Sequence, residues 1–306
     1  MENEDSGAAP QQYYASNGYY VWRNLIDSAK IDQLLARYKT DIASATIPFF
    51  RQNSSRYEKN KLTQHGYVQQ SFLDIHQYKE FPEFSNHAMD IYTSTVMRDA
   101  LRSVTGFQSC NLMQTMFFDA NTETWPHQDW WYLDTVPNGN LLAAWFALED
   151  IDEKAGRFFV LPKSQTVDLH SDTPNLAHTD WIERMRKYVG DHPEQVYAPA
   201  LKKGDVLFWN SRLIHGSLPT KDPSFSRKSL TAHYMPSEFV FGNLFTRKEW
   251  IRYKEHNGMK YYRNQPDYTF YNKLKYGIKA SVYDSPRAIK ELRKIQKLFS
   301  GFRDGL

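Results

Sequence analysis

Residues 203–217 read KGDVLFWNSRLIHGS, and this stretch is the most informative part of the sequence for predicting the fold. A turn signal at Lys203-Gly204-Asp205 precedes a short apolar run that ends at Trp209, which is typical of a buried strand. A His-Gly-Ser sequence follows it. The sequence therefore places His215 at the end of a buried strand.

Several other segments have strand or helix character. Apolar or alternating patterns predict strands at 18–22, 112–118, 141–148, 156–161 and 228–234. Helical spacing of apolar residues predicts helices over 26–38 with Asp27 or Ser28 as the cap, over 90–104, and around 181–188. Helices first and short strands later indicate an α+β protein with a mainly β core.

We expect one domain with additions at its ends. Residues 1–12 are small and polar and predict a flexible N-terminus, and residues 13–245 form the domain, with an insertion at 166–200. Residues 246–306 are expected to be a basic C-terminal extension, helical and packed on the domain. Residues 247–306 hold 15 Lys/Arg against 6 Asp/Glu. Such a tail can attract an anionic partner, but it matches no nucleic-acid module, so a solvated helical surface is the preferred interpretation.

Composition excludes several classes of protein. The 306 residues are 41% hydrophobic and 24% charged, unlike a disordered or collagen-like chain. No apolar run approaches the roughly 18–20 residues that span a bilayer, and the acidic residues 1–5 lack the apolar segment of a signal peptide. Cys110 is the single cysteine, which excludes a disulfide framework or a Cys-rich zinc site. We therefore expect a cytoplasmic protein without membrane insertion.

The candidate metal ligands lie in two distant stretches. His127 and Asp129 are two residues apart, and on a strand such residues point to the same face. With His215 they supply two histidines and one carboxylate, the facial triad of non-haem Fe(II) oxygenases, which leaves positions for a co-substrate and O₂. Two histidines and a carboxylate also serve hydrolytic zinc enzymes, so the residues alone leave that alternative open.

Arg227 follows His215 by 12 residues, a spacing that suits a strand, a turn and a neighbouring strand. Its planar, permanently charged fork suits a bidentate carboxylate. An arginine beside open iron positions predicts an organic acid that chelates the metal at one end and is clamped at the other, and 2-oxoglutarate has that shape. A surface arginine in a hairpin is the alternative.

The chain resembles the phytanoyl-CoA dioxygenase family of Fe(II)/2-oxoglutarate oxygenases over approximately residues 13–240. Order and spacing agree across several segments, which makes the resemblance specific. The segments are HQDWWY at 127–132, AWFALE at 144–149, GRFFVLPKS at 156–164, HGS at 215–217 and RKSLTAHY at 227–234, with NGYYV and RNLI at 17–26 similar to the family's first strand and turn.

The resemblance implies a double-stranded β-helix, the jelly-roll or cupin-like fold, with flanking helices. It implies that His127, Asp129 and His215 bind iron and that Arg227 clamps the distal carboxylate of 2-oxoglutarate. The remaining residues that it implies are Ser217, Trp145 and Gln114 for the co-substrate pocket, and Trp130, Trp131, Tyr132 and His233 for the substrate side.

The chain departs from the family pattern at two places. Phe118 stands where many members have a lysine, and Lys163 and Gln165 stand where the family commonly has glycine and histidine. Any charge contact from position 118 is therefore lost or supplied elsewhere. Positions 163 and 165 lie outside the metal triad, so there we expect an altered loop rather than altered chemistry. Members that halogenate typically lack the metal-binding carboxylate, and the presence of Asp129 disfavours that reaction.

The expected function is a dioxygenase that uses Fe(II), 2-oxoglutarate and O₂ to oxidise, by default to hydroxylate, an unactivated C–H of a small molecule, with release of succinate and CO₂. The aromatic residues after the metal motif favour an apolar or ring-containing substrate, although aromatic platforms also bind sugars. Two alternatives stay open: a non-catalytic jelly-roll binding protein, and a zinc hydrolase using the same triad.

Overall fold

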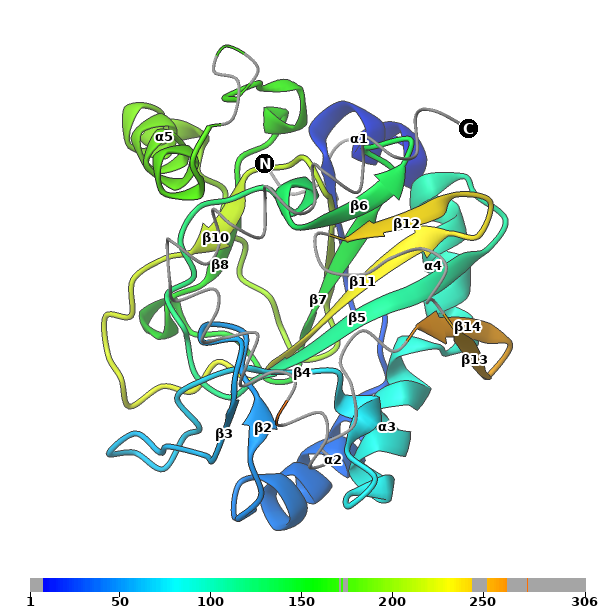
Figure 1. Cartoon of the computed structure of the whole chain (residues 1–306), viewed down its shortest axis with the longest axis vertical. Coiled ribbons are helices and arrows are strands. Elements are labelled where there is room, and N and C mark those ends of the chain that lie inside the picture. The colour runs from blue at the N-terminus through cyan, green and yellow to red at the C-terminus, as the bar shows by residue number, and fades with distance from the viewer. Residues whose placement is uncertain (1–7, 171, 173–175, 244–251, 263–273, 275–306) are drawn as a thin grey trace.

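The structure is a computed structural model, and it describes residues 8–170, 172, 176–243, 252–262 and 274. Its centre is a large sheet that runs in the order β1-β9-β7-β11-β5-β14-β13, with β4 also paired to β5. The strands are β1 (Tyr19–Trp22), β4 (Phe72–Leu73), β5 (Cys110–Phe118), β7 (Leu142–Ala147), β9 (Val206–Asn210), β11 (Ser229–Pro236), β13 (Tyr253–His256) and β14 (Met259–Tyr262). The predicted strands are thus found within a residue or two of their expected bounds (Figure 1).

Three short ribbons accompany the large sheet. They pair β8 (Phe158–Val160) with β10 (His215–Ser217), β6 (Leu133–Val136) with β12 (Val240–Asn243), and β2 (Phe49–Phe50) with β3 (Tyr57–Glu58). The β8–β10 ribbon forms a second layer, because Phe158 packs on Trp145 of β7 and Trp209 of β9 with ring centroids 6.0 and 4.9 Å apart.

The two faces of the large sheet carry different side chains. On β11, Leu230, Ala232 and Tyr234 belong to the core shared with the helices, whereas Ser229, Thr231 and His233 alternate with them and point to the opposite face. The helices that cover the apolar face are α2 (Ser28–Arg37), α3 (Pro82–Tyr92) and α4 (Thr95–Thr105). The buried polar face is therefore the inner face, between the sheet and the β8–β10 layer.

The helices confirm one expectation and correct another. Asp27 caps α2 through a hydrogen bond from the Ala29 backbone nitrogen (2.8 Å), as expected. The single helix expected over 90–104 is wrong, because α3 ends at Tyr92 and Ser94 caps α4 by accepting from Met97 N at 3.3 Å.

The N-terminal boundary also differs from the expectation. A helix, α1 (Pro10–Asn17), begins inside the stretch expected to be flexible, with proline at its first position. The prediction of a flexible 1–12 is therefore wrong from Pro10 onward, and residues 1–7 lie outside the described residues.

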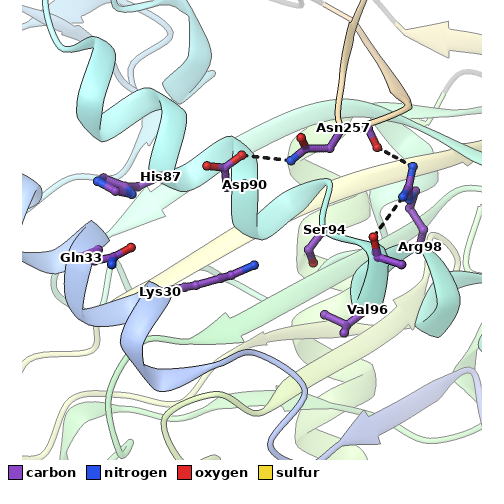
Figure 2. Close-up of a pocket in the computed structure, with 9 residues that line it drawn as sticks. Lys30, Gln33, His87, Asp90, Ser94, Val96, Arg98 and Asn257 are labelled. Carbon is purple, nitrogen blue, oxygen red and sulfur yellow. Dashed lines mark hydrogen bonds between the residues drawn. The ribbon is translucent and has the colours of Figure 1, made fainter.

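The C-terminal extension is expected to be helical, and this is wrong for residues 253–262. Residues 253–262 form the β13–β14 hairpin, whose β14 pairs with β5 in parallel at Tyr261 and Leu112. Asp90 of α3 accepts from Asn257 at 3.0 Å and lies 2.8 Å from His256 Nε2 (Figure 2). The hairpin thus contacts β5 and α3. Apart from Leu274, the rest of 263–306 lies outside the described residues.

The hairpin borders a hollow of about 510 Å³ on the helical side of the molecule (Figure 2). Lys30, Asp90, Ser94 and Arg98 are among its lining residues, and Arg98 donates to the backbone oxygen of Asn257 and, at 3.1 Å, to Thr95 Oγ1. None of the residues proposed for metal or co-substrate binding lines it.

The insertion at 166–200 contains α5 (His178–Asp191), close to the helix expected around 181–188. Trp181 of this helix is fully buried and stacks on Trp131 at 4.5 Å. Among the described helices, none is both long and apolar enough to cross a bilayer.

Candidate metal centre

His127 and His215 are brought together by their backbones. Each donates its N–H to the carbonyl oxygen of the other at 3.0 Å, which makes them a hydrogen-bonded antiparallel pair whose side chains share a face. Their imidazole centroids are 4.3 Å apart. Two stretches 88 residues apart in the chain thus deliver two imidazoles to one point.

Asp129 completes the group. Its Oδ1 lies 3.6 Å from Nε2 of His127 and 3.6 Å from Nε2 of His215. The ligand atoms of all three buried residues lie within 4.8 Å of one another, so they could hold one metal ion. The strand argument for their convergence is wrong in detail, because His127 makes only an isolated bridge and Asp129 opens a short 3-10 helix, Asp129–Trp131.

The loop that carries Asp129 is tied to the loop before His215. Trp130 N donates to Ser211 O at 3.0 Å, and the Gln128 amide donates to Arg212 O. These hydrogen bonds hold the carboxylate in place relative to the two histidines. The position of Asp129 therefore depends on contacts between two loops and does not follow from strand alternation alone.

Backbone carbonyls set the orientation of both imidazoles. His127 Nδ1 is 2.9 Å from Trp125 O, and His215 Nδ1 is 2.9 Å from Leu213 O. A carbonyl only accepts hydrogen bonds, so each Nδ1 carries the proton and each Nε2 presents a lone pair toward Asp129. This is the arrangement in which histidines coordinate metals.

The charge states also suit a metal. Burial lowers the pKa of His215 to about 3, so this imidazole is neutral at pH 7. Burial alone would raise the pKa of Asp129, but the neighbouring imidazoles of His215, His233 and His127 hold it well below its ordinary value. A carboxylate and two neutral imidazoles are the forms that bind a divalent cation.

Arg227 lies two residues before β11 and is 1% exposed. Its Nη1 donates to Ser217 Oγ at 2.7 Å and to Gly156 O at 3.1 Å. Its Nε is buried without a hydrogen-bond partner, and no described carboxylate forms an ion pair with it. Burial lowers its pKa to about 9, which leaves the group charged at neutral pH. A buried cation without an anion is costly, and a bound anionic ligand would relieve that cost.

The spacing of this arginine from the triad suits a short diacid. His215 and Ser217 lie on the same face of β10, and two residues along a strand span about 7 Å. Since Ser217 accepts from Arg227, the guanidinium is fixed one strand repeat from a metal ligand. A small dicarboxylate such as 2-oxoglutarate fits such a site, because one end of the molecule can bind the metal while its other carboxylate binds the Arg227 guanidinium.

Trp145 and Gln114 fall on the inner face of the sheet. Trp145 on β7 is buried, and its ring centroid lies 5.9 Å from the Arg227 guanidinium, while Phe118 flanks the same group at 5.8 Å. Gln114 is buried on β5 in register with His233. The structure thus places Trp145 beside Arg227 and Gln114 beside His233 on the neighbouring strand.

The residues expected on the substrate side divide into two groups. Tyr132 packs edge-on against His127 at 6.0 Å, and its hydroxyl lies 2.6 Å from His178 Nε2. Trp131 stacks on Trp181, and Trp130 donates to Gln128 and packs 4.5 Å from His170. His233 instead faces the metal carboxylate, with Nε2 3.3 Å from Asp129 Oδ2.

Sequence reasoning missed three residues. Trp209 donates from Nε1 to Asp129 Oδ2 at 2.9 Å, although it lies in the informative stretch 203–217. Trp181 and His178 come from the insertion. The only sequence signal for Trp209 was its position as the last apolar residue before the polar end of a strand, and that signal is weak.

The departures from the family pattern have local explanations. Lys163 has a φ of 69°, in the left-handed region that favours glycine, so the residue that the family commonly has there would fit without strain. Gln165 is the middle residue of the short 3-10 helix that follows, Ser164–Thr166, and it donates at 3.4 Å to Ala15 O. The departure at 163–165 therefore changes a surface loop against α1.

Comparisons with known proteins agree with this geometry. The family model for phytanoyl-CoA dioxygenase (PhyH) matches residues 14–229. The peroxisomal phytanoyl-CoA dioxygenase of Bos taurus is 25% identical over 246 residues, which covers 76% of this chain and 69% of the relative. The phytanoyl-CoA dioxygenase domain-containing protein 1 of Danio rerio is 29% identical over 144 residues, 44% of this chain and 45% of the relative.

Two solved structures share the fold at low sequence identity. The non-heme alpha ketoglutarate dependent epimerase SnoN from nogalamycin biosynthesis matches with a TM-score of 0.54 and 17% identity, over 76% of this chain and 83% of that chain. EctD from S. alaskensis matches with a TM-score of 0.54 and 17% identity, and the match covers 79% of this chain and 82% of that chain. The predicted jelly-roll class is confirmed. Since the family model spans residues 14–229, the chain belongs to the phytanoyl-CoA dioxygenase family of iron- and 2-oxoglutarate-dependent oxygenases.

Proposed function

We propose that this chain is a dioxygenase that hydroxylates an unactivated C–H of a ring-containing or apolar small molecule, with conversion of 2-oxoglutarate and O₂ to succinate and CO₂. The observation that carries the proposal is the pairing of two features: three buried ligands within 4.8 Å of one another, and a buried arginine without a carboxylate partner beside them. A metal alone would explain the first feature. A metal with a bound diacid explains both.

Each residue has a definite task in this proposal. His127, Asp129 and His215 hold Fe(II), and Arg227 with Ser217 binds the distal carboxylate of the co-substrate. Bound iron with 2-oxoglutarate supplies the oxidising power for C–H cleavage. The inner-face side chains Trp145 and Phe118 exclude water from the charged end and so strengthen its electrostatic contacts.

The substrate side is formed by the aromatic cluster of Trp131, Tyr132, His178 and Trp181. Trp181 anchors α5 against Trp131, and this packing sets His178 against the Tyr132 hydroxyl next to His127. Stacked rings with a phenol and an imidazole at the rim suit a flat or cyclic molecule that carries a hydrogen-bonding group. Burial raises the pKa of Tyr132 to about 12, so its hydroxyl keeps its proton and can donate.

A turnover screen tests the proposal. The purified chain is incubated with Fe(II), 2-oxoglutarate and O₂, and succinate release is measured alone and with pools of cyclic and apolar metabolites. We expect slow release without substrate and a clear increase with at least one pool. Turnover with Zn(II) in the absence of 2-oxoglutarate would support a hydrolase instead, and binding of both ligands without succinate would support a binding protein.

Once a substrate is found, Tyr132→Phe tests the aromatic cluster. Loss of one hydrogen bond should raise KM for the substrate by about 5–10-fold, while slow succinate release without substrate stays at the wild-type rate. Tyr188→Phe, in the α5 helix that carries His178, is the matched control. An unchanged KM in Tyr132→Phe would remove this residue from the substrate site.

Residence in the cytoplasm remains a prediction of the sequence. The mammalian relatives bear the description peroxisomal, so imaging of the tagged chain in its own cells would decide between the two compartments.

A further inference from the structure

The two oxygens of Asp129 have different surroundings. Oδ1 faces the two imidazole Nε2 atoms, at 3.6 Å from each. Oδ2 faces away from them and meets two nitrogens, Trp209 Nε1 at 2.9 Å and His233 Nε2 at 3.3 Å. One oxygen is therefore directed to the metal position, while the other is occupied by protein.

Strand register explains why these two residues meet one carboxylate. Trp209 on β9 and His233 on β11 are both paired with Ala143, which lies between them on β7. Directly paired residues point to the same face of a sheet, and the methyl group of alanine leaves the space above it free. The indole and imidazole therefore converge over Ala143, with centroids 6.2 Å apart and planes at 78°.

In both contacts the nitrogen donates the hydrogen bond and Asp129 Oδ2 accepts it. An indole N–H only donates, and an ionised carboxylate only accepts. His233 Nε2 must therefore carry a proton to bond Oδ2, and its Nδ1 is buried without a hydrogen-bond partner among the described residues. The hydrogen bond of this ring goes to the carboxylate, which indicates that holding Asp129 is its task.

We infer that Trp209 and His233 are positioning residues that restrict Asp129 to one-oxygen coordination of the metal. Two donors on Oδ2 oppose rotation of the carboxylate into a two-oxygen chelate, which would consume a coordination position. The position kept open is one that 2-oxoglutarate or O₂ needs. This inference rests on the proposed iron site, and it assigns His233 to the carboxylate rather than to the substrate.

Co(II) binding tests the inference without turnover, because the visible spectrum of Co(II) reports its coordination number. Four proteins are titrated with Co(II) alone: the wild type, Trp209→Phe, His233→Leu and His233→Gln. We expect Co(II) affinity to fall about 10–100-fold in Trp209→Phe and His233→Leu, with an altered spectrum. His233→Gln restores an N–H donor and should recover part of both changes.

Trp22→Phe is the matched control, because Trp22 is also an indole on the large sheet but packs on Tyr20 and not on Asp129. Its Co(II) affinity and spectrum should equal those of the wild type. Melting temperatures of the metal-free proteins identify any variant that fails to fold, and His233→Gln then serves for comparison. Wild-type affinity and spectrum in folded Trp209→Phe and His233→Leu would overturn the inference. Absence of Co(II) binding in the wild type would instead overturn the proposed function.

Discussion

At the scale of residues, the interpretation of the site as one that binds an organic acid depends on the buried Arg227. Arg227 is surrounded by Ser217, Gly156 and two aromatic rings, and none of these neutralises its charge. Proteins rarely retain such a group without use, because its desolvation costs several kcal/mol. Its position one strand repeat from His215 suits the proposed role, in which a diacid would span from the metal to the fork.

Replacement of Arg227 should separate co-substrate binding from metal binding. We expect Arg227→Met to weaken 2-oxoglutarate about 100-fold, or about 2.7 kcal/mol, because the buried carboxylate then lacks its partner. Co(II) affinity without 2-oxoglutarate should not change. Titration calorimetry measures both. Arg186→Met, at an exposed position on α5, should match the wild type, and an unchanged 2-oxoglutarate affinity in Arg227→Met would exclude the clamp.

His215 predicts an acid sensitivity of the metal-free protein. Its folded pKa of about 3 lies below the ordinary value of 6.5, so below pH 6.5 the unfolded chain binds a proton that the folded chain does not. Stability should therefore fall by up to about 2 kcal/mol between pH 6.5 and pH 5. His215→Asn should lose this part of the pH dependence in urea unfolding with EDTA present. Equal pH slopes for both proteins would contradict the burial of a neutral His215.

At the scale of elements, local signals predicted the long strands of the large sheet, but they missed the junction between two helices and the C-terminal hairpin. Alternation along β11 and the apolar run of β7 predict both strands because each strand buries a defined face. The break at Thr93–Ser94 was missed because both residues are compatible with an amphipathic helix. The β13–β14 hairpin was missed although its two-residue turn is Asn257-Gly258, with φ of 48° and 74°, the strongest hairpin signal.

The same limit applies to the site. His127, Asp129, His215 and Arg227 could be found in the sequence because each motif is short and local. The contacts of Trp209 and His233 with Asp129 depend on the register of three strands and on the small Ala143 between them. Register of that kind is fixed by the folded sheet, so local patterns do not contain it.

Ser94 provides a stability prediction at this scale. Its hydroxyl accepts from Met97 N at 3.3 Å and donates to Ile91 O at 3.1 Å, and so it joins the end of α3 to the start of α4. Ser94→Ala should lower the free energy of unfolding by about 1 kcal/mol in urea titration. Ser44→Ala, at an exposed serine, should change it by less than about 0.5 kcal/mol. Equal stabilities of the two variants would show that this cap is not needed.

At the scale of the whole molecule, the apolar core and the candidate metal site lie on opposite faces of the large sheet. Helices α2, α3 and α4 cover one face of the large sheet with an apolar core, and the polar inner face is left for the triad and Arg227 (Figure 1). Helix α5 and the β13–β14 hairpin are additions at the periphery, and α5 reaches the metal loop through Trp181 and Trp131. If the proposed substrate side is correct, substrate choice can change with α5 while the metal site stays the same.

The most direct test is an anaerobic titration of the metal-free chain with Fe(II) and 2-oxoglutarate, observed by visible absorption. We expect a weak charge-transfer band that needs both ligands, because 2-oxoglutarate chelates iron held by His127, Asp129 and His215. His127→Ala should abolish the band, and Arg227→Met should shift its appearance to higher 2-oxoglutarate concentration. Absence of the band in the folded wild-type protein at saturating Fe(II) and 2-oxoglutarate would contradict the assignment of an oxygenase.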